Sequence, residues 1–434
     1  MPSSPSAEVP LLRLALPDGR PATLLLGEAS TVLSVDDTLV SSWDFAGRPY
    51  ALVRETGTYR RGLDGGLLWK REATAEGPRL RRRLSAGEGE PVVEAARADA
   101  ALAFAALSSG GTSVCPVPRD PPAPASADPS SPDSKGAPRD DVSQTVRRLR
   151  AIVAMDAAAL RDDAARFLAA SGPVGILPPD QYLALVARVT EGCSWNACTF
   201  CRLYRDVPFR WKRPDELRSH LAALCEYFGP SLASRRSVFL GDANALSLAH
   251  DRLLPLVEAV AARFPGMPLY SFLDAWTGQR RTAAEWRDYA RLGLKRVYVG
   301  LETGDPGLLA WLEKPGSPRD AVDLVGALHE AGIAAGMIVL LGAGGERFAE
   351  AHAARTAQAL TAMRLGPEDL VYFSEYVDDP GLAYGRRAAG APDLAPLPPA
   401  RNGELRREIL AAFRAADPAR PPRVATYDIR EFVY

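Results

Sequence analysis

The chain has 434 residues, enough for one large domain with additions or for roughly two or three ordinary domains. Hydrophobic residues make up 47% and charged residues 24%, which is typical of a globular protein and excludes a disordered or fibrous chain. The 52 lysines and arginines nearly balance the 53 aspartates and glutamates, so the whole chain lacks the positive surplus expected of a nucleic-acid-binding protein.

Two segments bear on the cellular location. The first twenty residues have no charged region followed by an apolar run, so no signal peptide is expected. The most apolar segment, 331–345, is interrupted by glycines and is shorter than the ~18 residues that a membrane-spanning helix needs. Five cysteines in so long a chain do not make a disulfide framework. These features predict a protein of the reducing cytoplasm with no membrane partner.

The N-terminal part of the chain has strand-like patterns. Between residues 10 and 85, short apolar runs alternate with turn signals, which predicts a β-rich domain over 1–109 that ends in a helix at 92–107. Residues 110–141 are rich in Pro, Ser, Asp and Gly and predict a disordered linker. Apolar positions at steps of three and four residues then predict a helical lead-in over 142–180.

From residue 181 onward, strand and helix patterns alternate. Strands are expected at 182–190, 237–241, 267–273, 295–302, 334–342 and 369–377, and helices at 214–228, 251–263, 282–292, 318–331 and 346–363. This order predicts an α/β fold in which a parallel sheet, flanked by helices, curls into a partial (βα)6-type barrel over 181–380. A C-terminal extension with a helix and a strand follows over 381–434. The functional site is expected where the strands end.

Three cysteines lie directly after the first of these strands. Cys193, Cys198 and Cys201 have the spacing C-x4-C-x2-C, which allows one short loop to fold around one metal centre. Structural zinc usually has four protein ligands, for which His220 and Cys225 are the nearest additional candidates. A [4Fe-4S] cluster held by three cysteines instead leaves one iron open to a small molecule.

The cysteine segment resembles the radical S-adenosylmethionine (SAM) superfamily. The usual motif of that superfamily is C-x3-C-x2-C with an aromatic residue before the third cysteine, a place that Phe200 takes here; the first spacing is longer by one residue. The similarity continues through "VFLGDANAL" at 238–246, "VYVGLETGDPGLLAWLEKP" at 297–315 and "GMIVLLGAGGE" at 336–346. It covers residues 181 to about 380.

The resemblance implies the cofactors and the residues that bind them. The three cysteines would bind a [4Fe-4S] cluster, and further residues would contact SAM. These are Phe200 near the adenine, Gly241 and Asp242 at the methionine ammonium although the usual glutamate is absent, Glu302 at the ribose or amino acid part, and Gly342 to Gly344 along the adenosine.

The resemblance also implies the reaction and the partners. One electron passed to SAM would produce a 5'-deoxyadenosyl radical, with a flavodoxin or ferredoxin-type protein as electron donor. The substrate is expected to be a small molecule or a peptide, and no nucleic acid is expected. Auxiliary clusters and a cobalamin domain are disfavoured, because only Cys115 and Cys225 remain and no histidine precedes residue 220.

Other interpretations of the same residues remain open. The glycine runs are also typical of tight turns, Asp242 and Asn244 of helix caps, Glu302 of a surface carboxylate and the four histidines of structural roles. The basic run 205–213 is either an anion site or a solvated loop. For the whole protein, the alternatives are a non-catalytic iron-sulfur electron-transfer or sensor protein and a zinc-stabilised binding module.

Overall fold

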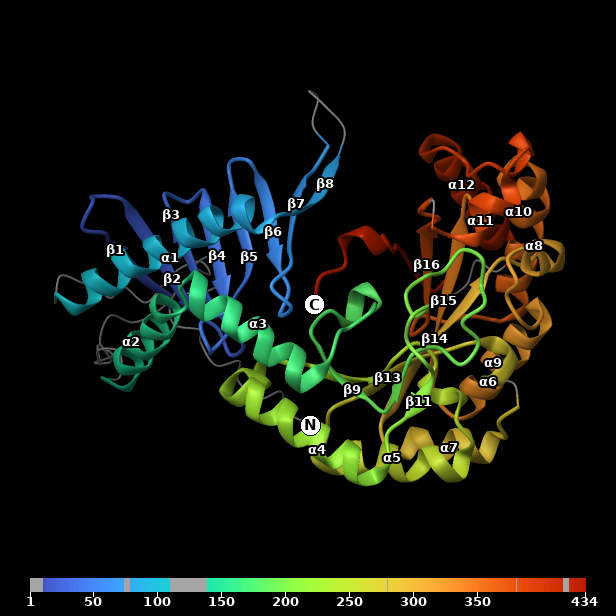
Figure 1. Cartoon of the computed structure of the whole chain (residues 1–434), viewed down its shortest axis with the longest axis horizontal. Helices are drawn as coiled ribbons and strands as arrows, with labels where there is room; N and C mark the ends of the chain where they lie inside the picture. The colour runs from blue at the N-terminus through green and yellow to red at the C-terminus, as the bar shows by residue number, and fades with distance from the viewer. Residues whose placement is uncertain (1–10, 74–78, 110–138, 279, 380, 417–420) are drawn as a thin grey trace, which may run out of the picture. The chain divides into compact units, whose positions relative to one another are not determined.

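The computed structural model describes residues 11–73, 79–109, 139–278, 280–379, 381–416 and 421–434 (Figure 1). The expected linker is mostly outside these ranges, and so is Cys115. The chain forms two compact units. The first unit comprises Met1–Gly172, Cys225–Arg235 and Val433–Tyr434, and the second comprises Pro173–Leu224 and Arg236–Phe432.

The first unit contains an eight-stranded sheet in which each strand pairs antiparallel with the next. Inward and outward residues alternate along the strands, as expected when one face of a sheet is covered. The strands are β1 (Leu11–Ala15), β2 (Pro21–Leu26), β3 (Thr31–Val35), β4 (Leu39–Trp43), β5 (Pro49–Arg54), β6 (Gly57–Arg61), β7 (Leu67–Arg71) and β8 (Leu80–Leu84). The β-rich character expected for the N-terminal part is therefore observed.

Three helices accompany this sheet: α1 (Ala86–Ser108), α2 (Arg139–Ala154) and α3 (Ala157–Ser171). Helix α1 crosses the strands (Figure 1) and buries Ala96, Ala100, Ala103 and Leu107, which recur at helical spacing, in a core with the sheet. Helix α1 begins earlier than the apolar pattern indicated, because Ser85 and Glu88 form a capping box at its start.

The second unit contains a seven-stranded parallel sheet with the order β17-β16-β15-β14-β13-β12-β9. The strands are β9 (Ala184–Arg188), β12 (Ser237–Gly241), β13 (Leu269–Leu273), β14 (Leu294–Glu302), β15 (Ala334–Leu341), β16 (Leu370–Glu375) and β17 (Arg423–Thr426). Strands β9 and β12 are buried along their whole length, as expected for parallel strands with both faces covered. The predicted α/β fold with a partial barrel is confirmed.

Helices alternate with these strands. They are α4 (Pro214–Phe228), α5 (His250–Arg263), α6 (Ala275–Gly278), α7 (Ala283–Arg291), α8 (Pro306–Trp311), α9 (Pro318–Glu330), α10 (Gly345–Ala362), α11 (Ala383–Ala388) and α12 (Pro399–Ala416). The five with predicted bounds, α4, α5, α7, α9 and α10, lie within one residue of them at each end. Capping boxes at Thr282 and Ser317 explain where α7 and α9 begin. Across the described ranges, no helix combines the length and the apolar character needed to cross a bilayer.

Strand β17 shows how the C-terminal extension is used. The extension was expected to hold a helix and a strand, and β17 is that strand. It pairs parallel with β16, with Leu370 opposite Arg423, and so becomes the seventh strand of the sheet. Just beyond it, the Tyr427 hydroxyl donates a hydrogen bond of 2.8 Å to the carbonyl of Leu177. The extension therefore belongs to the second unit as far as Phe432.

Candidate active site

A cavity of about 430 Å³ lies in the second unit, at the end of the sheet where the parallel strands finish. Several polar residues that line it are placed there by the strand ends: Asn244 after β12, Asp274 after β13, Glu302 at the end of β14, and Ser374 and Glu375 at the end of β16. Parallel α/β sheets bind their ligands at this edge. The cavity is thus in the place where the fold predicts a site.

All three clustered cysteines line this cavity. They lie on the loop that joins β10 (Thr190–Glu191) to β11 (Arg210–Trp211), two short strands that pair antiparallel and so bring the loop ends together. Gly192 begins the loop with a φ of +75°, and a Cβ there would be 2.6 Å from the carbonyl oxygen of Val207. Glycine is therefore required where the loop leaves β10.

Hydrogen bonds hold this loop against the following segments of the same unit. The backbone N–H of Thr199 donates to the carbonyl of Leu312 at 2.9 Å, and the N–H of Tyr384 donates to the carbonyl of Thr199 at 3.1 Å. The indole of Trp195 donates to the carbonyl of Glu313 at 2.8 Å. The cysteines are thus presented by a loop with a defined conformation.

Arg205 also braces the loop, a role that the sequence did not reveal. Its guanidinium donates to the carbonyl of Cys201 at 3.1 Å and to the carbonyl of Cys198 at 2.9 Å. Two other cations of the same basic run are paired with Glu191, at 2.7 Å for Arg210 and 2.5 Å for Lys212. These contacts give the run a structural role in and around the cysteine loop.

Burial disfavours the ionised form of two of the clustered thiols. It raises the pKa of Cys198 to about 12, although the nearby ammonium of Lys314 acts in the opposite direction. Burial also raises the pKa of Cys201. None of the clustered cysteines is in a disulfide. A metal centre supplies the positive charge that lets buried thiols ionise, so the donor set fits a cationic iron centre.

Lys314 and Glu302 form a buried ion pair in the same cavity, with 3.0 Å between Nζ and Oε1. Burial alone lowers the pKa of Lys314, but Glu302 and Cys198 outweigh it and the net shift is upward. The lysine therefore stays charged. Glu302 is only 7% exposed, so it is not a surface carboxylate. A Cβ on Gly300 would overlap Glu302 Oε1 and be 2.8 Å from Lys314 Nζ, which explains the glycine.

Asp242 directly precedes Ala243, which lines the cavity. The sheet register places Gly241 opposite Arg188, and the carboxylate of Asp242 accepts hydrogen bonds from that guanidinium at 2.9 and 3.0 Å and from the Gly192 N–H at 3.1 Å. Neither Gly241 nor Asp242 is among the lining residues, whereas Ala243 and Asn244 are. The buried ion pair occupies both carboxylate oxygens of Asp242.

Asn244 is engaged with neighbouring loops. Its side-chain amide donates to Ser194 Oγ at 2.7 Å and also to the carboxylate of Asp274. The backbone N–H of Asp274 returns a hydrogen bond of 3.1 Å to Asn244 Oδ1. Asn244 precedes a short turn of 3₁₀ helix without capping it through its side chain. Asn244 thus connects the cysteine loop to the end of β13.

The glycines after β15 have close neighbours of their own. A Cβ on Gly342 would be 2.7 Å from Asn402 Oδ1, and one on Gly344 would be 2.6 Å from Leu308 Cδ1. Both residues have positive φ, and Gly344 is the N-cap of α10. Neither is among the residues that line the cavity. Close packing against α8 and α12 therefore accounts for these glycines.

Phe200 lines the cavity and packs against the apolar cluster that contains Leu308 and Leu312. Phe200, Glu302 and the three cysteines are thus brought together around the cavity, whereas its lining does not include Gly241, Asp242, Gly342 or Gly344.

The candidate zinc ligands have other environments. His220 Nε2 accepts a hydrogen bond of 3.1 Å from the backbone N–H of Arg188, which occupies the lone pair that a metal would need. Cys225 belongs to the first unit. Within the described ranges, no group of three His, Cys, Asp or Glu side chains surrounds a position for a single metal ion. The ligands of a [4Fe-4S] cluster are spaced more widely, because each thiolate binds a different iron.

The other three histidines all have polar partners. His250 Nδ1 lies 3.0 Å from the Tyr289 hydroxyl, and His329 Nε2 lies 3.1 Å from the carboxylate of Asp369. His352 Nδ1 lies 2.7 Å from Thr303 Oγ1, and burial lowers its pKa to about 4. No histidine appears among the residues that line the cavity. Their contacts agree with the structural roles considered for them.

Comparison with known proteins found a matching family model and several similar solved structures. Coproporphyrinogen III oxidase (HemN) from Escherichia coli is 16% identical over 58% of this chain and 55% of its own, with a TM-score of 0.41. SuiB from Streptococcus suis is 13% identical over 68% of this chain and 58% of its own, also with a TM-score of 0.41. The methyltransferase TsrM from Kitasatospora setae is 16% identical over 44% and 35%, with a TM-score of 0.33.

This chain thus spans about a third to just over half of the length of these three proteins. No curated protein matches it. The family comparison is specific: residues 188–355 match the radical SAM superfamily, and this segment contains the three cysteines, Glu302 and Lys314. The resemblance that the sequence indicated is thus confirmed as a radical SAM superfamily match over residues 188–355.

Proposed function

We propose that this protein is a radical SAM enzyme in which Cys193, Cys198 and Cys201 hold a [4Fe-4S] cluster and the adjoining cavity binds SAM. The observation that carries the proposal is that three thiols from one braced loop line the same cavity as the polar residues at the strand ends. Held by these three cysteines, a reduced cluster would supply the single electron needed for reductive cleavage of a carbon-sulfur bond of SAM to a 5'-deoxyadenosyl radical.

The chain's own residues would prepare the cavity for this reaction. The ammonium of Lys314 compensates part of the negative charge of the thiolates, and Glu302 keeps that ammonium in place. Apolar side chains that line the cavity exclude water from a reactive intermediate; they include Phe272, Tyr298 and Ile338.

We assign the SAM contacts as follows. Phe200 would pack near the adenine, and Glu302 would face the ribose or the amino acid part. Gly241 and Asp242 would act at the methionine ammonium through the adjoining backbone, since the carboxylate is paired with Arg188. Gly342 to Gly344 would let the backbone approach the adenosine closely. Asn244 and Asp274, which also line the cavity, supply further polar groups that the sequence did not indicate as SAM contacts.

The substrate is proposed to be a small molecule or a peptide. The cavity of about 430 Å³ has a size typical of small-molecule sites, and its walls are largely apolar. The electron would come from a flavodoxin or ferredoxin-type protein.

The test is anaerobic reconstitution with iron and sulfide, followed by reduction with dithionite in the presence of SAM. We expect SAM to perturb the spectrum of the cluster and 5'-deoxyadenosine to form. A four-iron cluster whose spectrum does not respond to SAM would favour a non-catalytic electron-transfer or sensor protein. About one zinc per chain without labile sulfide would favour a binding module.

Replacing Arg205 with alanine is expected to destabilise the cluster without removing a ligand. The change deletes two charge-assisted hydrogen bonds to the carbonyls of Cys198 and Cys201. We expect the reconstituted cluster to be lost to a chelator about 10-fold faster, which corresponds to ~1.4 kcal/mol. The decay of cluster absorbance measures this rate. Arg213→Ala is the matched control, because Arg213 is exposed and its partner is Glu216. Equal rates for the two variants would contradict the bracing role.

Replacing Lys314 with methionine is expected to lower the reduction potential of the cluster. The variant removes a buried positive charge near Cys198 and leaves the carboxylate of Glu302 without its partner. Both effects oppose the addition of an electron, and a tenfold change in the equilibrium constant is about 60 mV for a one-electron couple. A redox titration followed by electron paramagnetic resonance should show at least that shift. Lys314→Arg should restore the potential, and Lys295→Met, at an exposed position of β14, should not change it.

A further inference from the structure

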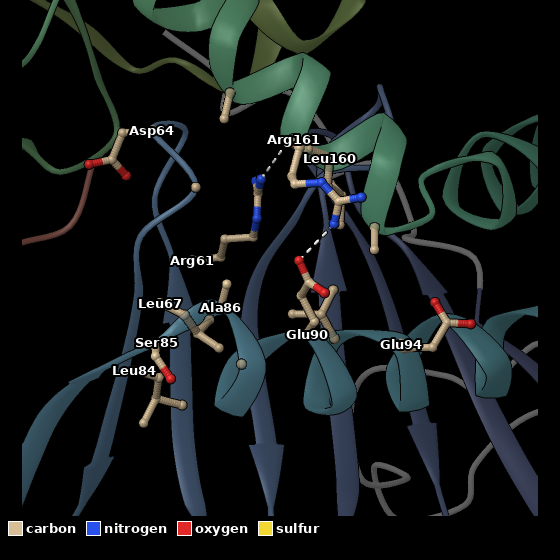
Figure 2. Close-up of a pocket in the computed structure, with 15 residues that line it drawn as sticks. Arg61, Asp64, Leu67, Leu84, Ser85, Ala86, Glu90, Glu94, Leu160 and Arg161 are labelled. Atoms are coloured by element: carbon tan, nitrogen blue, oxygen red, sulfur yellow. Dashed lines mark hydrogen bonds and ion pairs between the residues drawn. The ribbon is translucent and has the colours of Figure 1, made fainter.

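A second cavity, of about 290 Å³, lies within the first unit between the sheet and helices α1 and α3 (Figure 2). Apolar side chains from β7, β8, α1 and α3 form part of its wall: Leu67, Leu84, Val93 and Leu160. Gly89 of α1 also lines it, and a Cβ there would be 2.9 Å from Leu67 Cδ2. Its volume is at the lower end of the range for small-molecule sites.

Arg61 brings a cation into this apolar cavity. It extends from the end of β6 toward α3, and its Nη2 donates a hydrogen bond of 2.9 Å to the carbonyl of Leu160 (Figure 2). Its Nη1 is buried and has no hydrogen-bond partner among the described residues. Burial lowers the pKa of Arg61, and the nearby charge of Asp163 does not offset this effect. Among the described residues, the only hydrogen-bond acceptor for this guanidinium is thus the carbonyl of Leu160.

The carboxylates around the cavity have partners elsewhere. Glu90 pairs with Arg161 at 2.7 Å (Figure 2), and Glu94 accepts a hydrogen bond of 2.8 Å from Arg97. Asp64 Oδ1 accepts a hydrogen bond of 2.9 Å from the backbone N–H of Gly66. These contacts leave Nη1 of Arg61 as a buried donor without an acceptor in the described part of the chain, on a residue that lines the cavity. Buried donors are normally satisfied, so this one indicates a missing acceptor.

We propose that this cavity binds the carboxylate of a molecule with a small apolar body, with the carboxylate on Arg61 and the body against Leu67, Leu84 and Val93. A planar guanidinium forms strong, charge-assisted hydrogen bonds with a carboxylate, and the surrounding low dielectric strengthens them. Two sources have this chemistry: a free aliphatic acid, and the C-terminus of a peptide that ends in an apolar residue. The site lies within the first unit and does not depend on the proposed radical chemistry.

The test is calorimetric titration of the full-length protein with two acids and their uncharged controls. Octanoate is compared with 1-octanol, and the free acid of acetyl-Gly-Leu is compared with its amide. We expect octanoate or the acid peptide to bind at least 10-fold more tightly than its uncharged counterpart. Whichever acid binds identifies the source. Arg61→Met should weaken that binding at least 10-fold, and Arg13→Met, at an exposed position of β1, should leave it unchanged.

A second variant separates loss of binding from misfolding of the Arg61→Met protein. Val93→Phe fills the cavity from its apolar side and leaves Arg61 in place, so it should also weaken binding at least 10-fold while the thermal unfolding midpoint stays near that of the wild type. The proposal is overturned if neither acid binds, if the uncharged compounds bind equally well, or if a folded Arg61→Met variant binds as the wild type does.

Discussion

Cys198→Ala is expected to abolish both the stable cluster and the formation of 5'-deoxyadenosine. Cys198 is the central cysteine of the loop, and its thiol is buried in the cavity wall. Loss of partners in the second coordination shell already costs 10–100-fold in metal affinity or activity, so loss of one of three ligands should cost more than about 100-fold. Iron and labile sulfide analysis after anaerobic reconstitution measures the first effect, and chromatography of the reaction with SAM measures the second.

The control for this prediction is Cys225→Ala, which removes a half-buried cysteine of the first unit. It should keep the iron content and the deoxyadenosine yield of the wild type. Cys193→Ala and Cys201→Ala should behave like Cys198→Ala, because each cysteine is proposed to bind a different iron. A Cys198→Ala protein with full iron content and normal SAM cleavage would show that the cluster is held elsewhere.

Asp163→Ala is expected to destabilise the first unit by about 3–5 kcal/mol, as is usual when one partner of a buried ion pair is removed. The Asp163 carboxylate accepts hydrogen bonds from Arg48 Nε and from the hydroxyl of Tyr227, both at 2.9 Å. The guanidinium of Arg48 is only 3% exposed, and Asp44 is its one other carboxylate partner among the described residues. Without Asp163, a buried cation would lose half of its compensating charge.

Amide hydrogen exchange is the appropriate measurement, because unfolding of a chain with two units is not described by one transition. The slowest amides of β4 and β5 should exchange with a free energy lowered by the stated amount. Asp162→Ala changes the exposed neighbouring residue and should alter the exchange by less than ~0.5 kcal/mol. Unchanged exchange in Asp163→Ala would mean that the ion pairs do not stabilise this unit.

Much of the second unit could be predicted from the sequence, since its elements are encoded locally. The strand pattern at 237–241 and the helix pattern at 214–228 coincide with β12 and α4. Buried parallel strands appear as short apolar runs, and capping residues such as Thr282 mark where helices begin. The cysteine spacing likewise identified the loop that lines the cavity, because all three residues are close in the sequence.

Contacts between distant segments could not be predicted in this way. The end of α4 and the residues after it, Cys225–Arg235, belong to the first unit, where Tyr227 meets Asp163 across 64 sequence positions. Arg205 appeared as one cation among several in a basic run, yet it is the one that donates to the carbonyls of the cysteine loop. Nothing in the local pattern distinguishes it from its neighbours.

The amino-acid sequence alone determined the α/β class, the order of strands and helices in the second unit, and the cysteine loop after the first strand. The tertiary structure decided that β17 is the seventh strand, that Lys314 pairs with Glu302 beside Cys198, and that Arg61 lies in an apolar cavity. The physical reason is that periodicity and capping depend on residues a few positions apart, whereas burial and charge compensation depend on residues that only folding brings together.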